Sequence, residues 1–157
     1  MKQSTMIKLT AWLLAIAINT VGVAVYLNIK GLDGGFLSQI EKGDADIQDG
    51  KYDKALKHYL KAAEIAPESP IGFMNAAATY VSIGDIDSAI RVMEQYTSKS
   101  PRSSESYEYL LSLYEEAEVP VEKRVELLTE ASLLFPDSSF ADRAGELKLQ
   151  LAQEAGS

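Results

Sequence analysis

An uncharged, mostly apolar run lies close to the start of the chain. Residues 9–29 contain no charged side chain and are bounded by Lys8 and Lys30. At about 1.5 Å of rise per residue, a helix over this run is roughly 30 Å long, which matches the hydrocarbon core of a bilayer. Trp12 and Tyr26 lie near its two ends, where amphipathic rings favour the membrane interface. The pattern predicts a transmembrane anchor over residues 9–29.

A cleaved signal peptide is the alternative interpretation of this run. Residues 1–8 (MKQSTMIK) would form its basic start, and Gly22 and Ala24 would supply small residues at a cleavage site. The run is longer than the apolar core of a usual signal peptide and continues past Ala24, which favours a permanent anchor. Cleavage would instead leave a secreted or periplasmic soluble protein.

The charges beside the run predict its orientation. Lys2, Lys8 and the α-amine precede the run, whereas Lys30 is followed by no further basic residue until Lys42. Because positive charge is favoured on the cytoplasmic side, we expect the tail over residues 1–8 in the cytoplasm. The rest of the chain would then lie on the extracytoplasmic side of a single-pass membrane protein.

Asn19 is a polar residue near the middle of the predicted span. A side-chain amide in hydrocarbon is costly and seeks a hydrogen-bond partner. That partner is either another membrane helix or the backbone of its own helix. A contact with a second copy would make the chain a self-associating structural membrane protein, which stays a further alternative.

Beyond a glycine-containing linker over residues 30–35, the chain repeats itself. Three similar segments each end in proline, at Pro67, Pro101 and Pro136, which are 34 and 35 residues apart. The segments read DGKYDKALKHYLKAAEIAP, IGDIDSAIRVMEQYTSKSP and EVPVEKRVELLTEASLLFP. A period of about 34 residues with two helical patterns per unit predicts an α-helical repeat array.

The same residue types recur in phase within each unit. The turn glycines are Gly50 and Gly84, and the helices that follow the turns start with the apolar residues Tyr52, Ile86 and Val121. Small residues recur at Ala55 and Ala89 and again at Ala62 and Ala131. Large apolar residues recur at Tyr59, Met93 and Leu128, at Phe73 and Tyr107, and at Tyr80 and Tyr114. This pattern resembles the tetratricopeptide repeat (TPR) family over residues 36–138. The resemblance implies three units of two helices each, over residues 36–69, 70–103 and 104–138.

Each unit departs from the TPR pattern at particular positions. Unit one has Gln39 and Asp46 where an aromatic and a large apolar residue are usual. Unit two has Tyr96 where a small alanine is expected, and unit three has Arg124 at the close-approach alanine position. Unit three also carries one extra residue in its turn, near Glu118. We therefore expect looser packing between the two helices of unit three.

The last segment, over residues 139–157, predicts a capping helix and a tail. From about Phe140 to Gln153, one apolar stripe is formed by Phe140, Ala144, Leu147 and Leu151. A repeat array needs such a helix to cover its last apolar face. The predicted fold is all-α: an N-terminal transmembrane helix, a three-repeat TPR α-solenoid and a C-terminal capping helix.

Charge and composition exclude several kinds of site. From residue 31 onward the chain has 12 basic and 23 acidic residues, a net charge of −11, which repels nucleic acid. There is no cysteine, and the only histidine is His58, which we expect to be solvated. Asp44, Asp46 and Asp49 do not match the spacing of a calcium loop. We predict a binding protein rather than an enzyme, with no cofactor and no metal.

The resemblance to TPR proteins implies a ligand groove lined by the first helix of each unit. Its implied partner-binding residues are Ile40, Asp44, Ile47, Ile71, Met74, Asn75, Ala78, Val81, Glu105, Glu108, Tyr109, Ser112 and Glu115. These residues are mostly apolar in the first two units and acidic in the third, where we expect the glutamates to face solvent. The predicted partner is a protein or peptide, amphipathic and carrying basic residues.

One TPR subclass clamps the C-terminal carboxylate of chaperones with basic residues and an asparagine. Asn75 lies where that clamp has its asparagine, but the basic positions are occupied by Ile40, Glu105 and Tyr109. The sequence therefore predicts no such clamp. The predicted function is that of a membrane-anchored TPR adaptor or scaffold, such as an accessory subunit or assembly factor of a membrane complex.

Overall fold

The computed structural model describes residues 35–100, 103–136 and 138–155. The predicted anchor over residues 9–29, the tail before it, Asn19 and nearly all of the linker lie outside the described residues. Within the part of the chain that the structure describes, no helix is long and apolar enough to span a membrane.

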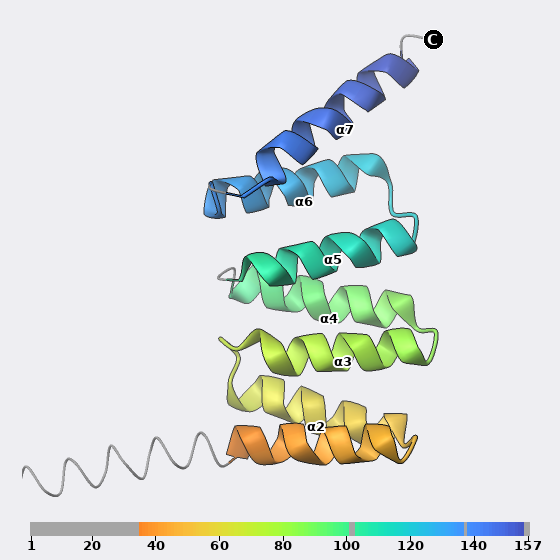
Figure 1. Ribbon diagram of the computed structural model, residues 1–157, viewed down its shortest axis with the longest axis vertical. Helices are drawn as coiled ribbons and strands as arrows, with labels where there is room; N and C mark the ends of the chain where they lie inside the picture. The colour runs from red at the N-terminus through yellow and green to blue at the C-terminus, as the bar shows by residue number, and fades with distance from the viewer. Residues whose placement is uncertain (1–34, 101–102, 137, 156–157) are drawn as a thin grey trace, which may run out of the picture.

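Seven helices make up the described residues, which include no strand. The first covers residues 35–48. It is followed by α2 (Tyr52–Ile65), α3 (Pro70–Ser82), α4 (Ile86–Lys99), α5 (Ser104–Glu116), α6 (Val121–Leu134) and α7 (Phe140–Ala155). Successive helices run in opposite directions and stack into an elongated array, from which α7 departs at an angle (Figure 1). The predicted all-α solenoid is confirmed for this part of the chain.

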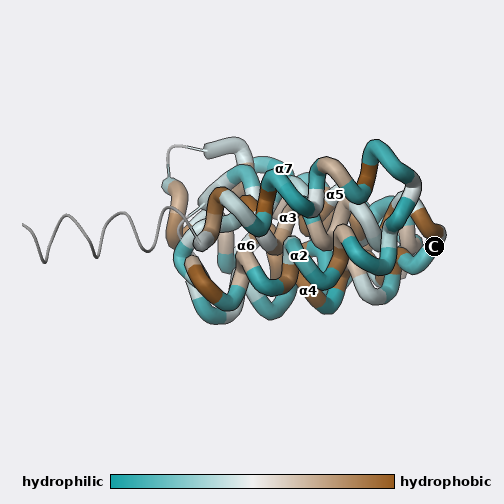
Figure 2. Tube along the Cα trace, turned by 90° about the horizontal axis from the view of Figure 1, so that it is seen from below, coloured by the Kyte–Doolittle hydropathy of each residue, from teal (hydrophilic) through white to brown (hydrophobic). Residues whose placement is uncertain are grey.

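Each helix has an amphipathic pattern that suits this stack. Seen along the array, hydrophobic and hydrophilic stretches alternate along the helices (Figure 2). Small residues lie where helices approach closely: Ala55, Ala62, Ala89 and Ala131 are fully buried. At Gly72 of α3 the backbone of α2 is so close that a Cβ atom would lie 2.6 Å from the backbone nitrogen of Ala63.

The three turns within the units share one hydrogen-bonding pattern. Gly50 and Gly84 have φ angles of 70° and 81°, as expected for left-handed helix ends. In the third turn this position is taken by Glu118, with a φ of 50°. The residue that follows each of them donates its amide to the carbonyl five residues earlier, at 2.7–2.9 Å. The extra residue of unit three is thus Pro120, which directly precedes α6.

The departure at Tyr96 is accommodated by an aromatic contact. Tyr96 is only 1% exposed and packs against Phe73, with 5.2 Å between the ring centroids. Its hydroxyl lies 3.4 Å from the backbone carbonyl oxygen of Glu68, in the loop between α2 and α3. The large ring therefore fills space between the first two units where a small residue was expected.

The departure of unit one is accommodated by a polar contact between its two helices. The Nδ1 atom of His58 lies 2.7 Å from Oε1 of Gln39, and its Nε2 atom lies 3.6 Å from Oδ2 of Asp46. The side chain of His58 is 32% exposed. His58 is therefore not simply solvated, contrary to the prediction from the sequence, because it is hydrogen-bonded to Gln39 and lies close to Asp46, the two residues that replace the usual apolar pair.

The predicted capping helix is confirmed as α7, two residues longer than expected. Phe140 and Ala144 are buried, and Leu147 packs against the same core. The Phe140 ring packs against those of Tyr107 and Phe135, with centroid distances of 6.5 Å and 6.3 Å. The apolar stripe of α7 therefore covers the end of unit three.

Candidate functional site: the groove of the first helices

The apolar part of the predicted groove is only partly used for packing. Ile40 and Ile47 on the helix over residues 35–48 are half-buried against α2 and α3. On α3, Met74 and Val81 are also half-buried against the core, whereas Ile71 is 47% exposed. Part of each side chain supports the stack, and the remainder is left as an apolar strip on the surface.

The other groove residues of the first two units differ in their surroundings. Ala78 is exposed and Asn75 is half-buried on α3. Asp44 is exposed, yet it accepts a 2.6 Å hydrogen bond from the hydroxyl of Tyr59 on α2. Burial, together with this bond to a carboxylate, raises the pKa of the Tyr59 hydroxyl. Asp44 therefore holds unit one together in addition to lining its surface.

The third unit contributes an acidic surface to the groove. The prediction that its glutamates face solvent is confirmed. Glu105, Glu108 and Glu115 are exposed on α5. Between them, Ser112 donates its hydroxyl to the backbone carbonyl of Tyr109 at 2.7 Å. Tyr109 is half-buried, and its burial and the nearby Glu116 raise the pKa of its hydroxyl.

Arg143 of α7 pairs with two of these glutamates. This arginine is not among the groove residues predicted from the sequence. Its Nη1 atom lies 2.6 Å from Oε2 of Glu108, and Nη2 lies 4.0 Å from Oε1 of Glu115. Arg143 follows Glu108 by 35 residues, just as Glu108 follows Met74 by 34. Extending the period by one unit would have found it, since α7 takes the place of a fourth first helix.

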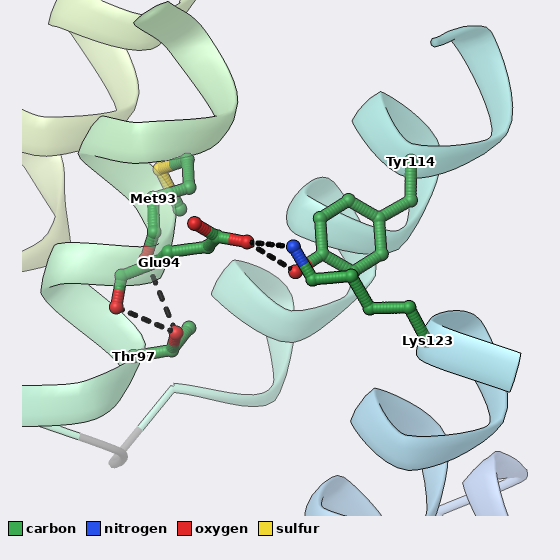
Figure 3. Close-up of polar contacts among 5 residues, drawn as sticks. All are labelled: Met93, Glu94, Thr97, Tyr114 and Lys123. Atoms are coloured by element: carbon green, nitrogen blue, oxygen red, sulfur yellow. Dashed lines mark hydrogen bonds and ion pairs between the residues drawn. The ribbon is translucent and has the colours of Figure 1, made fainter. Parts of the chain in front are cut away.

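A cluster of three polar residues fixes the second unit against the third. Oε1 of Glu94 on α4 accepts hydrogen bonds from the hydroxyl of Tyr114 on α5 and the ammonium of Lys123 on α6, both at 2.6 Å. Figure 3 shows both donors converging on the same carboxylate oxygen. The ammonium also lies 4.9 Å from the centroid of the Tyr114 ring.

The charges of this cluster shift the pKa values of its members. Burial would raise the pKa of Glu94, but the hydrogen bonds from Lys123 and Tyr114 outweigh it and hold the value below its ordinary range. Burial and the bond to Glu94 raise the pKa of the Tyr114 hydroxyl. The Glu94 carboxylate thus links α4 to α5 and α6. It helps to position unit three, which carries the acidic end of the groove.

Within residues 35–100, 103–136 and 138–155, no three histidine, cysteine or acidic side chains are grouped so that they could hold a metal ion. What the groove offers is surface: an apolar strip on the first two units, followed by carboxylates and one guanidinium.

Two other proteins are similar to parts of this chain in sequence. The chain is 33% identical over 92 residues to the small glutamine-rich tetratricopeptide repeat-containing protein 2 of Mycosarcoma maydis, covering 55% of this chain and 26% of that protein. It is 27% identical over 110 residues to the mitochondrial import receptor subunit TOM70 of Saccharomyces cerevisiae, covering 70% of this chain and 17% of TOM70. The chain thus spans about a quarter or less of these relatives.

Comparison with solved structures agrees on the fold. The second TPR domain of human RPAP3, in complex with the HSP70 peptide SGPTIEEVD, superimposes with a TM-score of 0.54 at 16% identity, covering 74% of this chain and 98% of that domain. A family model described as TPR repeat matches residues 43–84. The described helices therefore have the fold of TPR domains.

Proposed function

We propose that the chain is a membrane-anchored TPR adaptor that holds a partner protein in the groove of its first helices. The anchor is the uncharged run over residues 9–29, which is long enough to span a bilayer as a helix. The partner-binding part is the solenoid over residues 36–138. No catalytic step is part of this proposal, because binding alone accounts for the surface that the groove presents.

The observation that carries the proposal is the partly exposed apolar strip on α3. Ile71 is 47% exposed, Met74 and Val81 are half-buried, and Ala78 is exposed between them along the helix. Such a strip can bury the apolar face of an amphipathic helix or the alternate side chains of an extended peptide. Met74 adds a flexible and polarisable contact.

The acidic end favours a partner of opposite charge to the peptide held by RPAP3. That peptide, SGPTIEEVD, has three acidic residues among its last four. In this chain the positions of the basic clamp are occupied by Ile40, Glu105 and Tyr109. Like charges would repel an acidic peptide there, so a basic partner is favoured, with a larger effect on association rate than on affinity.

Site-specific photocrosslinking in membranes would test this proposal. A photoreactive residue at Ala78 lies on the exposed part of the strip, and one at Leu149, which is 62% exposed on α7, serves as the matched control. We expect a heteromeric product from position 78 and none from position 149. Products containing only two copies of this chain would favour the self-associating alternative, and equal products from both positions would contradict groove binding.

A further inference from the structure

We propose that one edge of the helical array lies on the surface of the membrane that holds the anchor. This proximal edge consists of the starts of the first helices and the ends of α2, α4 and α6. The opposite, distal edge consists of the three turns at Gly50, Gly84 and Glu118. The inference rests on the proposed membrane anchoring, and it names the bilayer as a second binding surface for the array.

Local contacts show that the proximal edge is one continuous side of the array. A Cβ atom on Gly35 would lie 3.7 Å from Cδ1 of Ile65, so the described chain begins beside the end of α2. Ser100, after α4, donates its hydroxyl to the carbonyl of Pro67 at 3.2 Å. Figure 1 shows these helix ends together on the left of the stack and the three turns on the right.

Large apolar side chains gather on this edge. Seven large hydrophobic side chains are exposed in the part of the chain that the structure describes, and four of them belong to the proximal edge: Leu37 (54%), Ile71 (47%), Leu133 (81%) and Leu134 (43%). Leu134 also lines one cleft with Phe135 and Ser104. Exposed leucines spread along one edge suit the boundary between headgroups and acyl chains, where apolar side chains leave water.

The charges of the two edges also favour the proximal edge as the side that faces the membrane. Counting the three helical residues nearest each edge and the described loop residues, the distal edge has nine acidic side chains, against the basic Lys51, Lys54 and Lys123: Asp46, Asp49, Asp53, Asp85, Asp87, Glu115, Glu116, Glu118 and Glu122. Counted in the same way, with the start of α7 included, the proximal edge has Glu64, Glu68, Glu105 and Asp142 against Lys99. Because headgroups carry phosphate, the distal edge is repelled more strongly, and the proximal edge is the better surface to face the bilayer.

The linker is too short to hold the array far from the membrane. Residues 30–34 separate the predicted span from the first described helix. At no more than about 3.6 Å per extended residue, these five residues reach at most ~18 Å. The linker places unit one near the bilayer but does not by itself bring Leu133, in unit three, to the surface. A bilayer contact at Leu133 therefore requires the array to lie along the membrane.

Tryptophan fluorescence in brominated lipid tests this orientation directly. The chain has a single tryptophan, Trp12, within the predicted span. The full natural chain and two variants in a Trp12→Phe background, Leu133→Trp and Ile83→Trp, would be reconstituted in phosphatidylcholine vesicles brominated near the headgroup. Ile83 is the matched control, because it is 45% exposed but lies at the distal edge. Circular dichroism would check that each variant keeps its helices, and Leu134→Trp, at the same end of α6, would replace Leu133→Trp if that variant does not.

We expect bromine to reduce the fluorescence of the natural chain and of Leu133→Trp, and to leave that of Ile83→Trp unchanged. If Trp12 is quenched but Leu133→Trp is not, the anchor stands and the proposed orientation is wrong. Equal quenching of Leu133→Trp and Ile83→Trp would also contradict the orientation. If Trp12 itself is not quenched, the proposed anchoring fails, and the inference fails with it.

Discussion

Arg143 of α7 forms an ion pair with Glu108 of α5, with 2.6 Å between Nη1 and Oε2. Both side chains are partly exposed, so the pair contributes only about 0.2–1 kcal/mol to stability. Its greater effect is on the charge of the groove, because one guanidinium neutralises part of the acidic end. The capping helix therefore influences which ligands the third unit attracts.

Removing this guanidinium should speed the association of a basic partner. We expect Arg143→Ala to raise the association rate of the partner captured at position 78, most clearly at low salt, because the acidic end regains its full charge. Arg143→Lys keeps the charge and should leave the rate close to that of the natural chain. Stopped-flow binding at two salt concentrations measures both, and a slower rate for Arg143→Ala would show that Arg143 itself contacts the partner.

The left-handed position at Glu118 predicts a stabilising substitution. Glu118 has a φ of 50°, whereas glycine occupies the same position in the other two turns. A non-glycine residue in this conformation costs about 1 kcal/mol or more, so Glu118→Gly should stabilise the array by up to about 1 kcal/mol. Urea unfolding of the full chain in detergent measures the change. Gly84→Ala should show the reverse sign, and stabilisation by both substitutions would be inconsistent with this account.

Two helical glycines should respond to alanine in opposite ways. A Cβ at Gly72 would lie 2.6 Å from a backbone atom of α2, whereas one at Gly145 would meet nothing within 4 Å. We expect Gly72→Ala to destabilise the fold by about 1–3 kcal/mol through overpacking. Gly145→Ala should stabilise it by about 0.5–1 kcal/mol through helix propensity. Thermal unfolding of the two variants side by side measures this contrast, and equal effects would refute the close approach of α2 and α3.

The cluster around Glu94 predicts a specific sensitivity to acid. Its hydrogen bonds hold the folded-state pKa of Glu94 below the unfolded value of about 4.3. The resulting stabilisation is present above that pH and is lost as the pH falls through the folded-state pKa. Glu94→Gln should therefore flatten the acid limb of a stability-versus-pH curve, and Tyr114→Phe, which removes one donor, should flatten it less. Identical acid limbs for all three proteins would rule out this role.

The helices were predictable from sequence because their signals are local and repeated. The apolar starts Tyr52, Ile86 and Val121 are the first residues of α2, α4 and α6. The period of the prolines fixed the phase of the units, so the fold followed from matches that reinforce one another. Tyr96 departs from the TPR pattern at a position that usually holds alanine. Its contact with Phe73 is not predictable from the local sequence, because Phe73 lies on another helix.

The polar contacts were harder to predict, because each depends on residues far apart in the chain. His58 lies on a different helix from Gln39 and Asp46, so its own sequence neighbours do not indicate this contact. Arg143 lies on the polar side of α7, outside the apolar stripe that predicts the helix, and its partner Glu108 is 35 residues earlier. In both cases the single residue carries no signal, and only its pairing across helices does.

The most direct test of the groove is the affinity of the captured partner for two matched variants. Met74→Glu places a carboxylate in the half-buried apolar strip, whereas Ile83→Glu places one at an exposed position on the distal edge. Because a partner would bury that carboxylate without a matching group, we predict that Met74→Glu weakens binding about tenfold or more while Ile83→Glu has little effect. Unchanged affinity for Met74→Glu, in a chain that keeps its helical circular dichroism, would show that the groove is not the binding site.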